Sequence, residues 1–65
     1  MWIEIIENEN DKYLINLDKV STIIKDNDGD IPGIKVAWDD GDHVHYDTSY
    51  ERIAAKLREA KVLKW

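Results

Sequence analysis

The chain has 65 residues, no cysteine, 35% charged residues and a formal net charge of −5. A chain of this length forms one domain, 1–65, and the lack of cysteine excludes disulfide bonds and zinc sites built on thiolates. No apolar run approaches the length of a membrane span, and no basic segment precedes an apolar one as in a secretory signal, so we expect a cytoplasmic protein.

The N-terminal part of the chain has the composition of a β-hairpin. Two runs rich in β-branched and aromatic residues, 2–6 and 12–17, flank the polar segment "ENEND". Strict alternation places Ile3 and Ile5 on one face of the first run and Trp2 on the other. We therefore predict two strands joined by a polar turn.

A third strand is predicted over 20–25, after a bend at Asp18 and Lys19. Alternation places Val20 on one side of this strand and Ile23 on the other. The strand would then carry apolar residues on both of its faces.

The segment 26–33, "DNDGDIPG", resembles a calcium loop because its carboxylates alternate. An EF-hand needs Gly at position 6 and Glu at position 12, but a loop that starts at Asp26 has Ile31 and Ala37 there. A frame that starts at Asp28 also fails. Asp-Gly and Pro-Gly are turn dipeptides, so we predict a loop between two strands rather than a calcium site.

Two further strands are predicted over 34–38 and 43–47, with Asp40-Gly41 at the centre of a tight hairpin turn. Alternation places five apolar or aromatic residues on the inward face: Ile34, Val36, Trp38, Val44 and Tyr46. Two readings of Trp38 and Tyr46 stay open, namely core packing and a surface on which a base or a partner side chain stacks.

The period of the apolar residues changes near residue 49, and we predict a helix over 49–61. Thr48 and Glu51 have the spacing of a capping box at its start. Apolar residues recur at the spacing of one helical stripe: Tyr50, Ile53, Ala54, Leu57 and Ala60. One helix covers one face of a sheet, so the predicted fold is α+β: a strongly bent five-stranded antiparallel meander, or a small open barrel, closed by one C-terminal helix.

Catalytic chemistry finds little support in this sequence. Ser21 and Ser49 lie outside any nucleophile motif, and the glycines form no phosphate-binding loop. His43 and His45 share one strand face with Asp47, but three ligands with no identifiable fourth group are a poor metal site beside the simpler reading of a solvated strand face. We expect a protein that is not an enzyme and that needs no cofactor.

The charge is unevenly distributed along the chain. Residues 1–50 carry four Lys against twelve Asp and Glu, a net of −8, whereas residues 51–65 carry five Lys and Arg against two Glu, a net of +3. Such an acidic body repels nucleic acid and suits a basic partner protein. We predict that the partner binds the aspartates of two loops: Asp26, Asp28, Asp30, Asp39, Asp40 and Asp42.

The apolar stripe of one helix cannot cover all the apolar side chains of the sheet. Exposing even three of the remaining side chains would cost several kcal/mol at about 25 cal/mol per Å². We therefore predict a homodimer that buries them. The strongest candidates are Trp2, Ile6, Leu63 and Trp65, with Leu14, Ile23 and Val62 beside them.

The layout resembles small β-rich proteins of Gram-positive bacteria and their phages, and it is similar to the small flagellar and swarming-motility protein family. The resemblance is carried by "MWIEI", by "INLDKVSTI", in which Asn16, Asp18, Val20 and Ile23 shape a bend, and by "TSYERIAAKL". It implies a phage or bacterial accessory protein, such as an inhibitor that presents carboxylates to a nucleic-acid-binding host factor. The alternative is a protein that binds or sequesters a nucleotide in a pocket between subunits.

Overall fold

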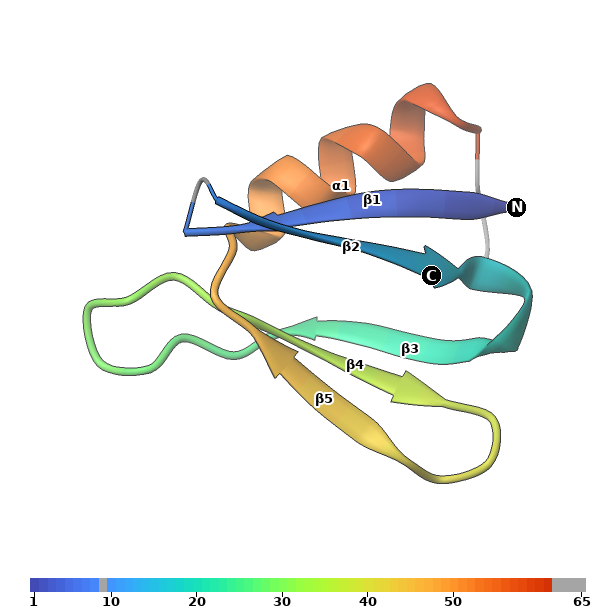
Figure 1. The fold of residues 1–65 in the computed structure, drawn as a ribbon, viewed down its shortest axis with the longest axis horizontal. Coiled ribbons are helices and arrows are strands. Elements are labelled where there is room, and N and C mark those ends of the chain that lie inside the picture. The colour runs from blue at the N-terminus through green and yellow to red at the C-terminus, as the bar shows by residue number, and fades with distance from the viewer. Residues whose placement is uncertain (9, 62–65) are drawn as a thin grey trace.

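The computed structural model describes residues 1–8 and 10–61, and within them five strands precede one α-helix (Figure 1). Strands β1 (Trp2–Glu7) and β2 (Asp11–Asn16) form an antiparallel hairpin. The other strands form a second antiparallel sheet in the order β3-β4-β5, and the helix follows: β3 (Val20–Lys25), β4 (Ile34–Trp38), β5 (His43–Tyr46) and α1 (Tyr50–Glu59). The fold is α+β, as predicted.

The strands divide into two sheets, so the single five-stranded meander is not confirmed. A short 3-10 helix, η1 (Leu17–Lys19), turns the chain between the sheets, and the Asn16 side chain accepts a hydrogen bond from the Asp18 amide at 3.1 Å. Leu17 is buried at this corner, and β3, which follows it, pairs with β4 and not with β2. The bend lies where the sequence predicts it, but at this bend the chain passes from the two-stranded sheet to the three-stranded sheet.

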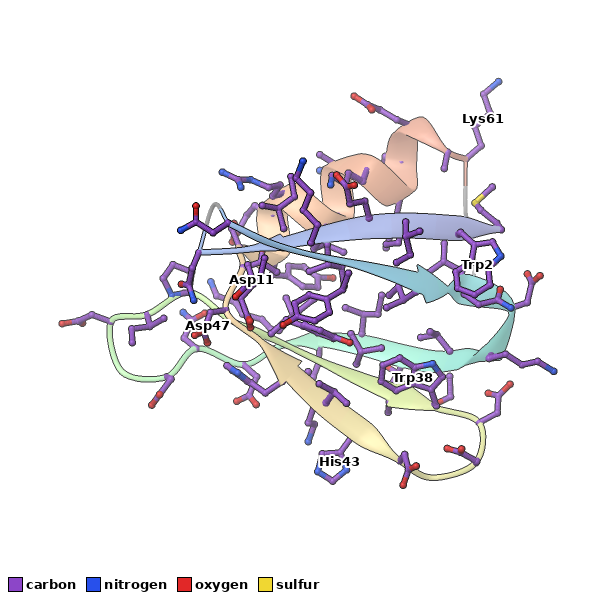
Figure 2. All side chains as sticks on the ribbon, viewed as in Figure 1. Trp2, Asp11, Trp38, His43, Asp47 and Lys61 are labelled. Atoms are coloured by element: carbon purple, nitrogen blue, oxygen red, sulfur yellow. The ribbon has the colours of Figure 1, made fainter. Side chains whose placement is uncertain are left out.

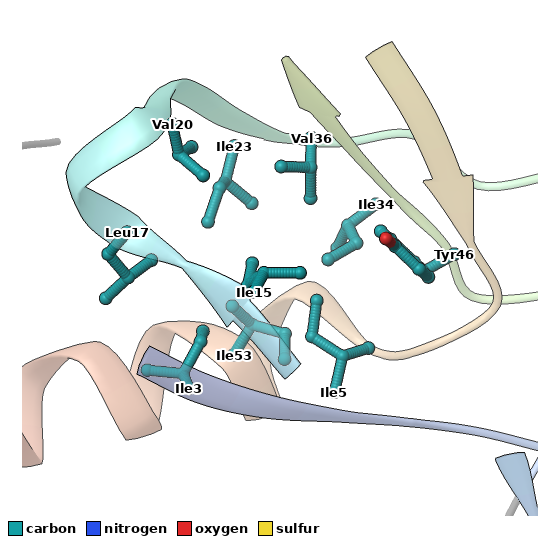
Figure 3. Packing of buried hydrophobic residues seen from close by; sticks show 10 residues of the cluster. All are labelled: Ile3, Ile5, Ile15, Leu17, Val20, Ile23, Ile34, Val36, Tyr46 and Ile53. Carbon is teal, nitrogen blue, oxygen red and sulfur yellow. The ribbon is translucent and has the colours of Figure 1, made fainter. Parts of the chain in front are cut away.

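The core lies between the hairpin, the three-stranded sheet and the helix (Figure 3). Ile53 is the residue that α1 buries completely, and it meets Ile3 and Ile5 of β1. Burying a side chain of this size contributes about 1.5–3 kcal/mol. The rest of the cluster comes from η1 and the other four strands: Ile15, Leu17, Val20, Ile23, Ile34, Val36 and Tyr46.

Strand β3 does not alternate as the sequence suggests, because Val20 and Ile23 are both buried. The pairing with β4 shifts register between Val20 and Thr22. An extra residue at such a bulge returns the next side chains to the same face. The prediction that Ile23 takes part in self-association is therefore wrong, since only 5% of it is exposed and it lies in the core.

The start of α1 also differs from the sequence prediction, in which Thr48 caps the helix. The N-cap is Ser49, whose hydroxyl accepts from the Arg52 amide at 3.4 Å and donates to a carboxylate oxygen of Glu51 at 3.0 Å. Thr48 is buried instead, and its hydroxyl has no hydrogen-bond partner among the described residues. The capping pattern is thus shifted by one residue.

Strand β5 ends at Tyr46 and is the edge of its sheet. The prediction that Val44 points into the core is wrong, because 43% of Val44 is exposed. The Tyr13 ring of the hairpin contacts the Tyr46 ring, with the ring centroids 5.3 Å apart. The hairpin therefore contacts β5 at its C-terminal residue Tyr46, whereas Val44, earlier in the strand, is exposed.

The turn between β4 and β5 contains Asp40 and Gly41, as predicted, and three residues, 39–41, lie between the bonded residues Trp38 and Asp42. Trp38 donates its amide to the Asp42 carbonyl at 2.8 Å, and Gly41 donates to the Trp38 carbonyl at 3.0 Å. Gly41 has a φ of +96°, which glycine adopts without steric cost. A three-residue turn with glycine at its last position is a common hairpin connection.

Candidate binding groove

An open groove of about 870 Å³ lies between the hairpin and the three-stranded sheet. Figure 2 shows Trp2 of β1 and Trp38 of β4 at the same end of the molecule, and both line this groove. The other lining residues are mainly from β2 and from the turn after β4: Lys12, Tyr13, Leu14, Ile15, Asn16, Lys19, Asp39, Asp40 and Tyr46.

The aromatic residues of the groove differ in burial. Tyr46 is 8% exposed and belongs to the core, whereas Trp38 packs against the core from a half-buried position and also faces the groove. Burial, and after it the neighbouring Tyr13 and Glu7, raises the pKa of Tyr46 above the usual value of 10.0. Tyr46 is thus a neutral core side chain, whereas Trp38 both packs against the core and lines the groove.

The hydrogen bonding of the hairpin defines which edge of β2 is open. Leu17 donates its amide to the Met1 carbonyl at 2.8 Å, and the pairing of Ile15 with Ile3 follows the same register. Hydrogen-bonded and non-bonded pairs alternate along antiparallel strands. The N–H and C=O groups of Lys12, Leu14 and Asn16 therefore point away from β1, toward a side where no other described strand pairs with β2.

The outer edge of β1, by contrast, lies under the helix. The Lys56 ammonium group donates to the Glu4 carbonyl at 2.7 Å, and α1 runs beside β1 in Figure 1. Glu4 pairs with Leu14, so its carbonyl belongs to the outer edge of β1 by the same alternation. The hairpin thus has one covered edge and one edge that borders the groove.

The hairpin presents exposed apolar side chains to the groove. Trp2 is 62% exposed, Leu14 is 67% exposed and Tyr13 is 41% exposed. The sequence assigns Trp2, Leu14 and Ile6 to self-association. Trp2 and Leu14 are exposed in the single chain and could contact a second copy, whereas Ile6 is half-buried. Val62, Leu63 and Trp65 lie outside the described residues.

The structure does not gather the six predicted aspartates into one surface. The loop 26–33 and the turn after β4 lie at opposite ends of the three-stranded sheet (Figure 1). Antiparallel connections alternate between the two ends of a sheet, so the separation follows from the topology. Asp39 and Asp40 line the groove, whereas Asp26 and Asp28 border a separate small depression with His45.

The loop 26–33 is a loop, as predicted, and its own backbone bonds close it. Asp28 and Ile31 exchange two amide-to-carbonyl hydrogen bonds of 2.9 Å, with Gly29 between them at a φ of +59°. The Gly33 amide donates to the Asn27 side chain at 3.1 Å. The segment is therefore a small internal hairpin, a geometry unlike the wrapped EF-hand loop.

His45 holds this loop against β5. Its Nε2 donates to the Asp26 carbonyl at 2.7 Å, and its Nδ1 lies 3.5 Å from a carboxylate oxygen of Asp47. Figure 2 shows His43 near one end of β5 and Asp47 beyond the other. Within residues 1–8 and 10–61, no three His, Asp or Glu side chains form a group that could hold a metal ion.

No protein-family model, curated protein or solved structure matches the chain significantly. The resemblance to the swarming-motility family is thus a prediction that these comparisons do not test. Among the described residues, no helix is both long and apolar enough to cross a bilayer.

Proposed function

We propose that the protein is a non-enzymatic interaction module whose groove binds an extended, basic segment of a partner protein. The observation that carries this proposal is that Trp2 and Trp38 line the groove together with the carboxylates of Asp39 and Asp40. Lys12 and Lys19 also line it, so the excess negative charge comes from the rest of residues 1–50. Indole faces attract Lys and Arg side chains, and carboxylates form charge-assisted hydrogen bonds with them.

The charge distribution supports a basic partner rather than a nucleic acid. Residues 1–50 have a net charge of −8, which repels phosphate groups and attracts cationic surfaces over about 8–10 Å at moderate salt. A phage or bacterial accessory protein that blocks a nucleic-acid-binding host factor would use this chemistry, because its carboxylates would take the place of phosphates. The loop 26–33 would add negative charge at the far end of the sheet.

A displayed library of random ten-residue peptides tests the proposal. We expect the selected peptides to be enriched in Lys and Arg, because Asp39 and Asp40 offer carboxylates beside the two indole rings of the groove. The double variant Asp39→Asn, Asp40→Asn should lose this enrichment while keeping the oxygen that accepts from the Asp42 amide in the turn. The matched control, Asp26→Asn with Asp28→Asn, removes the same charge at the opposite end and should keep the enrichment.

The proposal would be contradicted if the selected peptides contained no excess of basic residues. It would also be contradicted if the groove variant and the loop variant selected Lys and Arg to the same extent. The first result would show that charge does not select the partner. The second would show that the groove is not where the charge is recognised.

A small planar ligand such as a nucleotide is the second candidate, and the size of the groove favours it. Ligand sites commonly enclose about 300–1,000 Å³ with aromatic walls, and this groove measures about 870 Å³. The groove is formed by one chain, so the pocket between subunits suggested by the sequence is not required. A thermal-shift screen with nucleotides separates the candidates: a rise in Tm that Trp38→Leu abolishes supports the ligand.

A further inference from the structure

We infer that the open edge of β2 pairs antiparallel with the same edge of a second copy, across a two-fold axis at Leu14. The inference rests on the proposed function in so far as both use the groove beside this edge. The exposed backbone of an edge strand is a template for another strand. An isolated two-stranded hairpin is also only marginally stable, and this pairing would extend it to four strands.

The alternation along β2 selects the register. Lys12 and Leu14 turn both their N–H and C=O groups outward, and Asn16 adds its N–H, since its carbonyl accepts the first hydrogen bond of η1. An axis at Leu14 places Leu14 opposite Leu14 of the second copy and Lys12 opposite Asn16 of that copy, so Leu14 pairs fully and the Asn16 N–H donates to the Lys12 carbonyl. An axis at Lys12 would place two like charges opposite each other, which is destabilising. An axis at Tyr13 or at Ile15 would leave Asn16 or Lys12 without a partner within the strand.

The side chains fit the same register on both faces of the hairpin. Residues that lie directly opposite in an antiparallel pair share a face. Leu14, which is 67% exposed in the single chain, would meet its own equivalent. On the other face, Tyr13 would lie beside Ile15 of the second copy. Each copy would therefore cover exposed apolar surface of the other.

The proposed pairing also brings opposite charges together at one end of the groove. Asp39 donates its amide to the Lys19 carbonyl at 2.9 Å, which places the acidic turn next to the segment that follows Asn16. An antiparallel copy brings its own Lys12 to the Asn16 end, toward Asp39 and Asp40. The second copy thus offers a cation where the proposed function requires one, and self-association would compete with the binding of a basic partner.

Cysteine cross-linking tests the register. The chain has no cysteine, so Leu14→Cys places a single thiol at the proposed axis. A short bis-maleimide should join two copies of this variant at micromolar concentration. The control variant, Asp28→Cys in the exposed loop 26–33, should stay uncross-linked under the same conditions. Equal cross-linking of the two variants would overturn the inference.

Sedimentation over a concentration series tests the pairing itself. Leu14→Pro removes an N–H that points away from β1, a change that edge strands tolerate, and Leu14→Lys places like charges at the axis. Circular dichroism establishes which variants fold, and we expect either folded variant to dimerise at least about tenfold more weakly than the wild type.

A wild type that is monomeric at all concentrations would overturn the inference, as would variants that dimerise like it. These results are distinguishable from failure of the proposed function. A monomer that still selects basic peptides retains that function, whereas a dimer of this geometry that selects none retains only the pairing.

Discussion

Among the three glycines, Gly33 is the one at which an added Cβ atom would collide with neighbouring atoms. A Cβ atom there would lie 2.5 Å from the Asp26 carbonyl oxygen and 2.5 Å from Nε2 of His45, two atoms that already share a hydrogen bond. We predict that Gly33→Ala lowers the free energy of unfolding by about 1–3 kcal/mol, the usual cost of overpacking. Urea denaturation followed by Trp fluorescence measures it.

Asp30→Ala is the control for this prediction, because Asp30 is exposed in the same loop. Its effect should stay within about 0.5 kcal/mol. Equal stability of Gly33→Ala and the wild type would show that the loop does not contact His45 as described.

Glu51 gives the stability a dependence on pH. Its own backbone amide is the main cause that lowers the pKa of this carboxyl below 4.5, with the Ser49 hydroxyl and Lys25 adding to the effect. A lowered pKa means that the folded state favours the carboxylate. Its contribution is therefore complete above pH 4.5 and is lost as the pH falls through the lowered value.

We predict that Glu51→Gln is less stable than the wild type at pH 7 and that this difference disappears as the pH falls below the lowered pKa. Thermal unfolding of both proteins between pH 7 and pH 2.5 measures the difference in Tm. Glu59→Gln, at the other end of α1, controls for the loss of a glutamate from the helix. A constant difference across this range would contradict the assignment.

Among the elements, the sequence predicts the periodic segments and the positions of the junctions, but it does not predict the geometry of the junctions. The strands and α1 follow from alternation and from the helical stripe, because burial on one face imposes those periods on the sequence. The bulge after Val20 breaks the alternation, and it depends on how β3 pairs with β4, which the sequence of β3 does not contain. The corner at η1 likewise depends on the burial of Leu17 against the assembled core.

The N-cap of α1 is Ser49 and not Thr48, and this difference can be tested by mutation. Ser49→Ala removes the hydroxyl that accepts from the Arg52 amide, so it should cost about 0.5–2 kcal/mol of stability. Thr48→Val replaces a buried hydroxyl, which lacks a partner among the described residues, by a methyl group of similar size. We expect it to be neutral or stabilising. Chemical denaturation of the two variants measures both effects, and the reverse order would show that Thr48 is the cap.

At the scale of the whole molecule, the groove was the part least visible in the sequence. Trp2 and Trp38 belong to different sheets, and only the corner at η1 brings those sheets face to face. The sequence indicates that Trp2 and Leu14 are apolar residues that the single apolar stripe of α1 does not cover, and both are exposed in the structure. It assigned six aspartates of two loops to one partner, but composition does not say which end of a sheet each loop occupies.

The central claim is that the edge of β2 and its groove form the binding surface, and amide chemical shifts test it most directly. A ¹⁵N-labelled sample, dilute enough to be monomeric, is titrated with a peptide of alternating lysine and valine. We predict the largest shifts at the outward amides of Lys12, Leu14 and Asn16 and at the Trp38 indole. Shifts concentrated on the loop 26–33, or no shifts at all, would contradict it.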